Sequence, residues 1–496
     1  MKIIGGCLIL ISLITLFVNL SLRKNDTLKI YYQKLRRYII VAFNVNQGSS
    51  SILVALYIII NAIVIINAIL HNPIVGYDVS EHLKNVKYLA QFSLPTPQQS
   101  AEFFSPPLPY VMPAALYAFL TSLLASLPSI ADKVAMAAAG KAAQMVNIFL
   151  SLGLTFFLLM LCETLRPGNR VLKITTLGML AILPVYYKTF AQARPEPYVA
   201  FFFVLSMYLI IDLGQGQSSL TKQLALGGSL GLLLLARQWG FFLFPGLVIF
   251  FLWRSWQDRD NALYYLKTLG IALFCAFLIG GWFYLYLYGQ YGTITAFNRP
   301  GSAYFSFSNQ PGYFYFDLGL KKLFSSPLRD AFPNRFLPIM YSEIWGDYWG
   351  YFLADMYNLS RAPLSLLVRM NVFGIFPTLL LLGGLIFGGY YFFRQILARD
   401  RDMVSQGISL MFLVIITSLF AYGWFIIKYP SYNKGDTIKA TYLIYIFPFL
   451  CLMASEFIYA LGKNSSWIQR IIFACLLVVG LHNLQGLITH QWWLRF

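Results

Sequence analysis

Long runs of apolar residues, separated by short polar segments, recur along the whole chain. The run "SILVALYIIINAIVIINAIL" (51–70) has the length of about 20 residues that an apolar helix needs to cross a bilayer. Similar runs follow at about 143–163, 172–189, 196–213, 222–236, 238–253, 265–288, 371–393, 404–427, 440–461 and 471–488. The pattern predicts an all-α polytopic membrane protein with about 11–13 membrane-spanning helices.

The composition agrees with this class of protein. Hydrophobic residues make up 58% of the 496 residues and charged residues 11%, whereas soluble domains carry about 25% charged residues. The mean hydropathy is +0.64. All five cysteines lie in or beside apolar runs without paired spacing. We therefore expect them to be buried hydrophobic side chains, not a disulfide framework or a metal site.

The distribution of charge predicts which helix ends face the cytoplasm. The formal net charge is +18, and Lys and Arg gather in short loops between the apolar runs. The positive-inside rule places such loops in the cytoplasm, and no separate basic domain of the kind that binds nucleic acid is present. These loops are 22–37, 165–173, 253–260, 394–402 and 462–470.

The same alternation predicts the organisation of the chain. Residues 71–140 and 289–367 are expected to form two long outer loops with amphipathic helices. The shorter loop 428–442 is expected on the same outer side. Residues 3–21 predict an N-terminal membrane helix or signal anchor, because the run is long and lacks an A-x-A-like cleavage site. We expect 1–50 to hold this helix and a basic cytoplasmic segment, and 51–496 to form one domain of a plasma or inner membrane.

A cluster of polar residues stands at the point where the chain leaves the membrane after 51–70. It lies in "GYDVSEHLKNVKYLAQ" (76–91), which contains Asp78, Glu81 and His82. The spacing of Asp78 and Glu81 is typical of an N-terminal helix cap, whereas a carboxylate at the edge of a bilayer favours a functional site. The two interpretations are compatible. Carboxylate and imidazole side chains can also bind a divalent metal ion. The other histidines are scattered along the chain, however, which favours a hydrogen-bonding role for His82.

A second motif follows in the same loop, "FFSPPLPY" (103–110). Together the two motifs resemble the GT-C superfamily of integral-membrane glycosyltransferases, which includes protein O-mannosyltransferases and the aminoarabinose transferases of lipid A. Those proteins typically carry an Asp or Asp-Glu motif in the first outer loop and then an aromatic-Pro-Pro-Leu-Tyr element. The resemblance in motifs covers about 71–125, and the family's Asp-Glu doublet is Asp78-Val79 here. The residues that match the second element are Phe104, Pro106, Pro107, Leu108 and Tyr110.

The resemblance implies a fold, a reaction and a substrate class. It implies a GT-C-like membrane domain that transfers a sugar from a polyprenyl-phosphate donor to a glycan, lipid or protein acceptor on the non-cytoplasmic face. The anomeric centre is inverted, with Asp78 as general base and Glu81 and His82 in support. The resemblance calls for no nucleotide-binding loop and no certain cofactor.

Cations near the outer membrane surface are then expected to hold the lipid phosphate. Arg237 lies between two half-length apolar runs, and Lys439 and Tyr442 lie where the helix at 440–461 begins. Arg194 and Glu196 share a short outer turn. We expect Arg237, Lys439, Arg194 and Tyr442 to bind the donor. The alternative is that the cations are interfacial residues that extend to water.

The second outer loop contains "SEIWGDYWGYF" (342–352), in which Trp345 and Asp347 are candidates for sugar or acceptor binding, as is Glu196. Aromatic faces suit sugar rings and carboxylates suit hydroxyl groups, but an interfacial aromatic belt has the same composition. Two other functions remain open. One is a transporter or flippase of a lipid-linked sugar, although the chain shows no repeat of the kind that transporters carry. The other is a polymerase or ligase of surface polysaccharide.

Overall fold

A computed structural model describes residues 26–45, 50–126, 128–216, 219–294, 297, 301–302, 304–355, 359–398, 402–431 and 434–491. The membrane helix expected at 3–21 lies outside these ranges. Every regular element in the described ranges is a helix, which confirms the all-α class. Nine helical segments there are long and apolar enough to cross a membrane, and a tenth is counted if α7 and α8, which meet at 63°, form one span.

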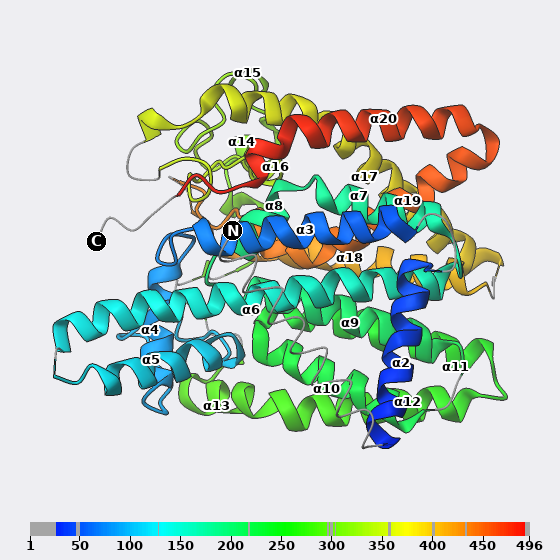
Figure 1. Cartoon of the computed structure of the whole chain (residues 1–496), viewed down its shortest axis with the longest axis horizontal. Coiled ribbons are helices and arrows are strands. Elements are labelled where there is room, and N and C mark those ends of the chain that lie inside the picture. The colour runs from blue at the N-terminus through cyan, green and yellow to red at the C-terminus, as the bar shows by residue number, and fades with distance from the viewer. Residues whose placement is uncertain are drawn as a thin grey trace.

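The long segments run side by side along the long axis of the molecule (Figure 1). Their bounds are α3 (Ser50–Leu70), α6 (Pro128–Leu165), α9 (Glu196–Gly214), η2 and α11 (Gln238–Phe242, Leu243–Gln257), α12, η3 and α13 (Ala262–Ala276, Phe277–Gly281, Trp282–Tyr291), α17 (Leu364–Ala398), α18 (Met403–Lys428), η6 and α19 (Ala440–Ile446, Phe447–Asn464) and α20 and η7 (Ser466–Asn483, Leu484–Leu487). The remaining helices are α2 (Asp26–Phe43), α4 (Val79–Leu89), η1 (Leu108–Tyr110), α5 (Val111–Leu123), α7 (Arg170–Ala181), α8 (Pro184–Ala191), α10 (Leu220–Ala236), η4 (Phe307–Asn309), α14 (Gly312–Phe316), α15 (Leu320–Leu323), α16 (Phe336–Trp345) and η5 (Leu359–Arg361).

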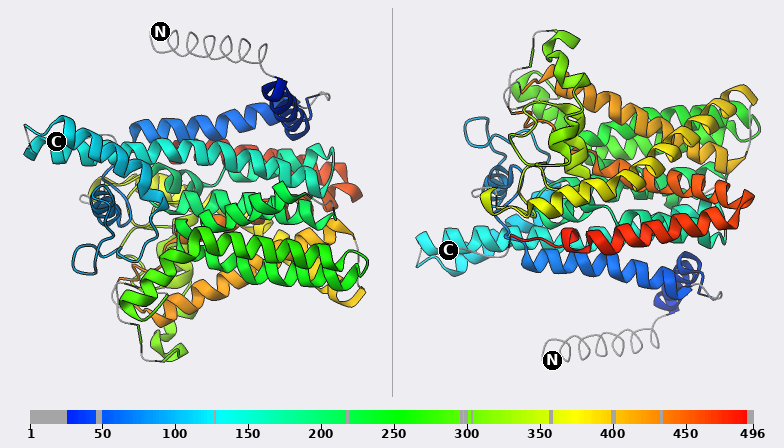
Figure 2. Two further views of the ribbon diagram at one scale, coloured as in Figure 1. Left: turned by 90° about the horizontal axis from the view of Figure 1, so that it is seen from below. Right: turned by 90° about the horizontal axis from the view of Figure 1, so that it is seen from above.

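The two ends of the bundle differ. The loops that carry α4, α14, α15 and α16 gather at one end, which we call the loop end, and α2 lies across the other (Figures 1 and 2). The C-terminal ends of α6, α11, α17 and α19 are all at the end with α2, which we call the basic end, because basic segments of the sequence lie next to these helix ends (Figure 1). The expected pairing of long loops on one side and basic loops on the other is therefore present.

Three helices differ from the expected pattern. The helix expected at 143–163 begins at Pro128 as part of the 38-residue α6, so residues 128–140, which were expected in the first loop, belong to this helix. The helix expected at 172–189 is broken before Pro184, because proline lacks an amide hydrogen and forces Leu183 into an extended conformation. The helix expected at 222–236 is present as α10, but its 17 residues make it shorter than the nine segments that can cross a membrane.

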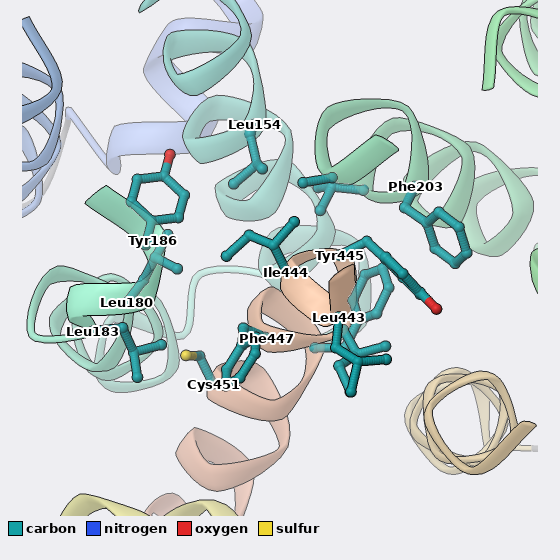
Figure 3. Packing of buried hydrophobic residues seen from close by; sticks show 14 of the residues in the cluster. Leu154, Leu180, Leu183, Tyr186, Phe203, Leu443, Ile444, Tyr445, Phe447 and Cys451 are labelled. Atoms are coloured by element: carbon teal, nitrogen blue, oxygen red, sulfur yellow. The ribbon is translucent and has the colours of Figure 1, made fainter. Parts of the chain in front are cut away.

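The middle of the bundle is filled by η6 and the first turns of α19, whose side chains pack between α6, α8 and α9 (Figure 3). All seven residues of η6 are buried. The ring of Tyr445 lies 4.4 Å from that of Phe203 in α9, centroid to centroid. Residues 440–446 are thus fixed by the core, and this fixes Lys439, the residue directly before them, at the loop end.

Glycines allow some helices to pack with their backbones in close contact. A Cβ on Gly227 of α10 would lie 2.5 Å from Cys275 in α12. A Cβ on Gly231 would lie 2.6 Å from Ile279 in η3, which continues α12. A Cβ on Gly384 of α17 would lie 2.4 Å from the backbone nitrogen of Ala454 in α19. Small residues at such contacts are the usual basis of helix packing in membranes, where the lipid gives little hydrophobic driving force.

Candidate active site

Asp78 directly precedes α4 at the loop end. Its backbone has φ 55° and ψ 16°, a left-handed conformation that few residues other than glycine adopt. The carboxylate makes no hydrogen bond to the first turn of α4, and Oδ2 accepts one from Lys439 Nζ at 2.5 Å. Glu81 accepts from Lys84 and from the amide of Ala101 instead of returning to Asp78. The prediction of a side-chain cap is therefore wrong, and Asp78 is engaged in an ion pair.

The ion pair is asymmetric in its exposure. The Lys439 side chain is 10% exposed and that of Asp78 is 37% exposed, so the carboxylate is the accessible partner. The backbone amide of Lys439 donates to the hydroxyl of Tyr422 at 2.9 Å, and Nζ also donates to that of Tyr442 at 3.3 Å. Burial has the largest single effect and raises the pKa of Asp78, but the charge and the hydrogen bond of Lys439, with smaller effects of His82 and Arg194, together lower that pKa below its ordinary value. Asp78 is therefore ionised at neutral pH.

Behind this pair, alternating acidic and basic side chains form a buried chain of charges. Glu102 Oε2 lies 2.6 Å from Arg237 Nη1, and Arg237 Nε lies 3.9 Å from Glu196 Oε1. Glu196 Oε2 in turn accepts from Arg194 Nε at 2.5 Å, and Arg194 Nη1 donates to Thr441 Oγ1 at 3.0 Å. All four charged residues are at least 96% buried. Buried charges of this kind are stable only when they are paired.

Two tyrosines connect Lys439 with Arg194. The guanidinium carbon of Arg194 lies 5.2 Å from the ring centre of Tyr77 and 5.6 Å from that of Tyr442. Lys439 Nζ lies 5.6 Å and 5.3 Å from the same two rings. Each distance is within the range of about 6 Å in which a cation is attracted to an aromatic face. The structure thus brings together Asp78, Arg194, Lys439 and Tyr442, which sequence analysis had placed in three separate segments.

Asp78 and Lys439 line a polar cavity of about 420 Å³. Its other lining residues come from both long loops and from the segment before η6 and include Glu102, Trp349 and Tyr351. Carboxylates, cations and aromatic rings therefore share one partly open space. Such a space is suited to a polar ligand with hydroxyl groups and flat apolar faces, since charged groups can hydrogen-bond the hydroxyls while rings contact the faces.

An apolar groove of about 380 Å³ adjoins the cavity. It is lined by aromatic and aliphatic side chains of η2, α18 and the first long loop, among them Trp239 and Trp424, and Arg237 is also part of its lining. Phe297, Phe425 and Tyr442 line both spaces. A ligand with a polar head and a hydrocarbon chain can therefore occupy the two together, with Tyr442, Lys439 and Arg237 near the junction.

The proline motif contributes to the same region. Phe104 lies under Arg237, with its ring centre 5.6 Å from the guanidinium carbon, and lines the groove. Tyr110 hydrogen-bonds Nδ1 of His82 at 2.8 Å, and the two rings are stacked. Burial lowers the pKa of His82 to about 4, so the imidazole is neutral at pH 7. The imidazole of His82 thus supports the packing of α4 against η1, and its Nδ1 bonds Tyr110 and not the carboxylate of Asp78.

The three polar residues of the first motif point to different partners. Glu81 lines a separate surface pocket with Lys84, while Asp78 pairs with Lys439 and His82 with Tyr110. Within the described ranges, no three His, Cys, Asp or Glu side chains are grouped so that they could hold a metal ion.

Trp345 and Asp347 are buried away from the cavity lining. Trp345 Nε1 donates to Thr378 Oγ1 at 2.7 Å. Asp347 Oδ2 accepts from the backbone amides of three consecutive residues, Phe352, Leu353 and Ala354, at 2.6–3.2 Å. These bonds shape the turn after α16, and that turn places Trp349 and Tyr351 in the cavity lining. The geometry therefore makes the neighbours of Asp347, and not Asp347 itself, available to a ligand.

Glu343 joins the two long loops beneath the cavity. Its Oε2 accepts from Lys188 Nζ at 2.8 Å and from the hydroxyl of Tyr77, and its Oε1 accepts from the amide of Trp349 at 3.1 Å. Glu343 and Lys188 are fully buried. Two cavity residues, Tyr77 from the first loop and Trp349 from the second, are thus fixed by one carboxylate.

The sequence analysis missed Tyr77 and Glu102 as lining residues. Tyr77 directly precedes Asp78, and Glu102 directly precedes the proline motif, so position next to a motif was the available signal for both. Trp349 lies in the aromatic segment that was selected, two residues after Asp347.

Comparison of the chain with protein-family models and with curated proteins gives no match in either set.

Proposed function

We propose that this protein is a GT-C-type glycosyltransferase that moves a sugar from a polyprenyl-phosphate donor to an acceptor at the loop end. The observation that carries the proposal is the position of Asp78, an ionised carboxylate in a polar cavity that shares three lining residues with an apolar groove. A polyprenyl-phosphate sugar has the matching chemistry, because it joins a polar sugar to a long hydrocarbon through an anionic phosphate.

In this proposal each part of the donor has its own place. The prenyl chain occupies the apolar groove beside Trp239 and Trp424. The sugar occupies the polar cavity with Trp349 and Tyr351. The phosphate then lies at the junction near Tyr442, where Lys439 lines the cavity and Arg237 lines the groove. Ammonium and guanidinium groups bind phosphate through charge-assisted hydrogen bonds.

Asp78 is the general base in this proposal. The acceptor hydroxyl forms a bond to the anomeric carbon as the bond from that carbon to the phosphate oxygen breaks. The hydroxyl proton passes to Asp78, and the electron pair of the broken bond leaves with polyprenyl phosphate. Lys439 and Arg237 stabilise the charge that grows on this leaving group. Attack from the face opposite the phosphate inverts the anomeric centre.

The ion pair with Lys439 gives the donor a way to activate the base. In the free protein, Lys439 holds the pKa of Asp78 low, which makes the carboxylate a weak proton acceptor. A phosphate that accepts hydrogen bonds from Lys439 competes with Asp78 for the ammonium group. Asp78 then becomes more basic when the donor is in place, so proton abstraction is coupled to donor binding.

The test is sugar transfer in membranes that contain the protein, supplied with a panel of labelled polyprenyl-phosphate sugars. We expect the Asp78→Asn variant to transfer at least about 100-fold more slowly than the wild type at matched expression, since a positioned general base contributes about that much. The matched control is Asp317→Asn, which removes a carboxylate of the second loop that pairs with Arg335 outside the cavity. Full activity of Asp78→Asn would remove Asp78 from the mechanism.

Movement of a lipid-linked sugar across the membrane is the second candidate function, and the groove beside a polar cavity is the feature that favours it. The same membranes separate the two: a flippase moves the donor between leaflets without forming a glycosylated product. Transfer that depends on Asp78 excludes a purely transporting role.

A further inference from the structure

The second long loop exposes a cluster of apolar side chains at the loop end. The cluster lies in residues 304–320, which contain η4, α14 and a single charged residue, Asp317. The ring of Tyr315 lies 6.1 Å from that of Phe307 and 6.1 Å from that of Phe316, centroid to centroid, so these rings form one surface. A large exposed apolar patch marks a surface that contacts something other than water. Six aromatic or leucine side chains of the segment are at least 44% exposed, namely Tyr304, Phe307, Tyr313, Phe316, Leu318 and Leu320.

The polar side chains of the same segment are bonded to the protein. The side-chain amide of Asn309 and the hydroxyl of Tyr315 donate to backbone carbonyls within the segment, each at 2.8 Å. Gln310 Nε2 donates to a carbonyl in the last turn of α18 at 2.7 Å. The carboxylate of Asp317 accepts from Arg335 Nε at 2.5 Å. Polar groups that are satisfied internally, with apolar groups turned outward, are the arrangement that a lipid environment requires and the reverse of a loop in water.

The segment is attached to a helix whose exposed face is apolar. Phe420, Trp424 and Lys428 follow each other at intervals of four residues, so they lie on one face of α18. Phe420 and Trp424 are 76% and 49% exposed on this membrane-spanning helix. Lys428 Nζ donates to the carbonyl of Ser302, and the amide of Ser302 donates to the carbonyl of Lys428 at 2.9 Å. The loop therefore joins α18 at the end of its lipid-facing surface, at the level where the helix leaves the membrane.

Cations follow the apolar side chains directly. Lys321 and Lys322 come after Leu320 in α15, and both are exposed. Rings and leucines beside lysines are typical of a segment that lies in the headgroup region of a bilayer, because the ammonium groups stay at the lipid phosphates while the apolar groups enter the acyl layer. This charge pattern, together with the attachment to the end of α18, favours a bilayer over a protein as the partner of the patch.

We propose that residues 304–320 insert their exposed side chains into the leaflet at the loop end. The rings and leucines lie about 5–10 Å below the headgroups, as the apolar face of an interfacial helix does. Lys321 and Lys322 remain at the phosphate level. The second long loop is thus held by the membrane as well as by the bundle, and insertion requires no catalytic activity.

The inserted segment borders the apolar groove. A Cβ on Gly301 would lie 2.9 Å from the ring of Tyr429, which lines the groove. Ile294 and Trp424 also line it and are 47% and 49% exposed, so the groove opens toward the same leaflet. A lipid donor would therefore enter beside this segment. That consequence rests on the proposed function, whereas the insertion itself does not.

The test places a fluorescent label on single cysteines of the full chain, in a parent whose five native cysteines are replaced by alanine. The protein is reconstituted into nanodiscs of phosphatidylcholine, with or without phosphatidylcholine that carries a nitroxide quencher near the top of its acyl chain. Tyr304→Cys and Phe316→Cys place the label in the patch, at side chains that are each 84% exposed. Phe420→Cys on α18 is the lipid-facing reference, and Gln98→Cys, in the exposed polar segment 96–99 of the first loop, is the water-facing reference.

We expect the lipid-bound nitroxide to quench the label at both patch positions, as it does at Phe420→Cys, and to leave that at Gln98→Cys bright. Iodide in the water should quench only Gln98→Cys. Quenching of either patch label by iodide and not by the nitroxide would overturn the proposal, because the patch would then be open to water and to a soluble partner. Protection of the patch labels from both quenchers would also overturn it, because protein would then cover the patch.

Discussion

Asp78 and Lys439 are 361 positions apart, and their contact at 2.5 Å sets the chemical state of the candidate base. Each residue was selected from the sequence for a local reason: a charge beside a membrane-spanning run is costly unless it is used. The pairing of the two could not be predicted in this way, because hydropathy and motif spacing carry no information about contacts between distant segments. The same holds for Arg237 and Glu102, which are 135 positions apart.

At the scale of the residue, replacing Lys439 with Met tests what sets the pKa of Asp78. In the wild type, Lys439 holds this pKa below the ordinary value of 3.8, so Asp78 stays ionised as the pH falls to 4. In Lys439→Met, burial is opposed only by the weaker electrostatic effects of His82 and Arg194, so the pKa of Asp78 rises. As the pH is lowered, kcat/KM for the donor should therefore fall at a pH at least about one unit higher in Lys439→Met than in the wild type.

The measurement is the pH profile of kcat/KM between pH 4 and pH 8. Lys188→Met is not a suitable control, because Lys188 fixes the loop through Glu343. Lys84→Met is suitable, because Lys84 bonds Glu81 outside the cavity. The wild type should show no acidic limb from Asp78 in this range, and the absence of such a limb in Lys439→Met as well would mean that the ion pair does not control the base.

At the scale of the element, the apolar runs predicted most of the spanning helices within a few residues of their ends. In lipid, the backbone amide and carbonyl groups of a spanning segment must hydrogen-bond to each other, so an apolar run of this length forms a helix. The predictions were less accurate where a helix continues beyond the membrane. The small residues of 130–142 extend α6 outward, and the end of an apolar run does not mark the end of the helix. The short helices α14, α15 and α16 have no membrane-length run to reveal them.

Contact between helices predicts the effect of one substitution in α17. A Cβ on Gly384 would lie 2.4 Å and 2.6 Å from the backbone N and Cα of Ala454, which cannot move without shifting α19. We expect Gly384→Ala to lower the free energy of unfolding by about 1–3 kcal/mol, as overpacking does in other cores. Thermal unfolding of the purified protein in detergent measures the change.

Gly270→Ala in α12 is the control for this substitution, because no atom lies within 4 Å of the added Cβ. It should leave the stability unchanged or raise it by about 1 kcal/mol, since alanine is the better helix former. Equal effects of the two substitutions would show that α17 and α19 are not in backbone contact.

At the scale of the whole molecule, the sequence predicted the separation of basic loops from long loops, and the structure places them at opposite ends (Figure 1). The sequence could not predict that a polar cavity and an apolar groove lie next to each other. It depends on Phe297, Phe425 and Tyr442, which come from three segments and meet only in the folded chain. Function at this scale rests on which side of the membrane the loop end faces.

The positive-inside rule predicts that the loop end faces away from the cytoplasm, and two single cysteines test it. Ser325 is exposed in the second long loop, and Asn261 is exposed between α11 and α12 at the basic end. In a parent whose five native cysteines are replaced by alanine, a membrane-impermeant maleimide should label Ser325→Cys in intact spheroplasts. Asn261→Cys should be labelled only after the membrane is opened. The physical reason is that the loop after α11, like the other basic loops, is retained on the side where it is synthesised. Labelling of Asn261→Cys in intact spheroplasts would place Asp78 on the cytoplasmic side and require a donor presented there.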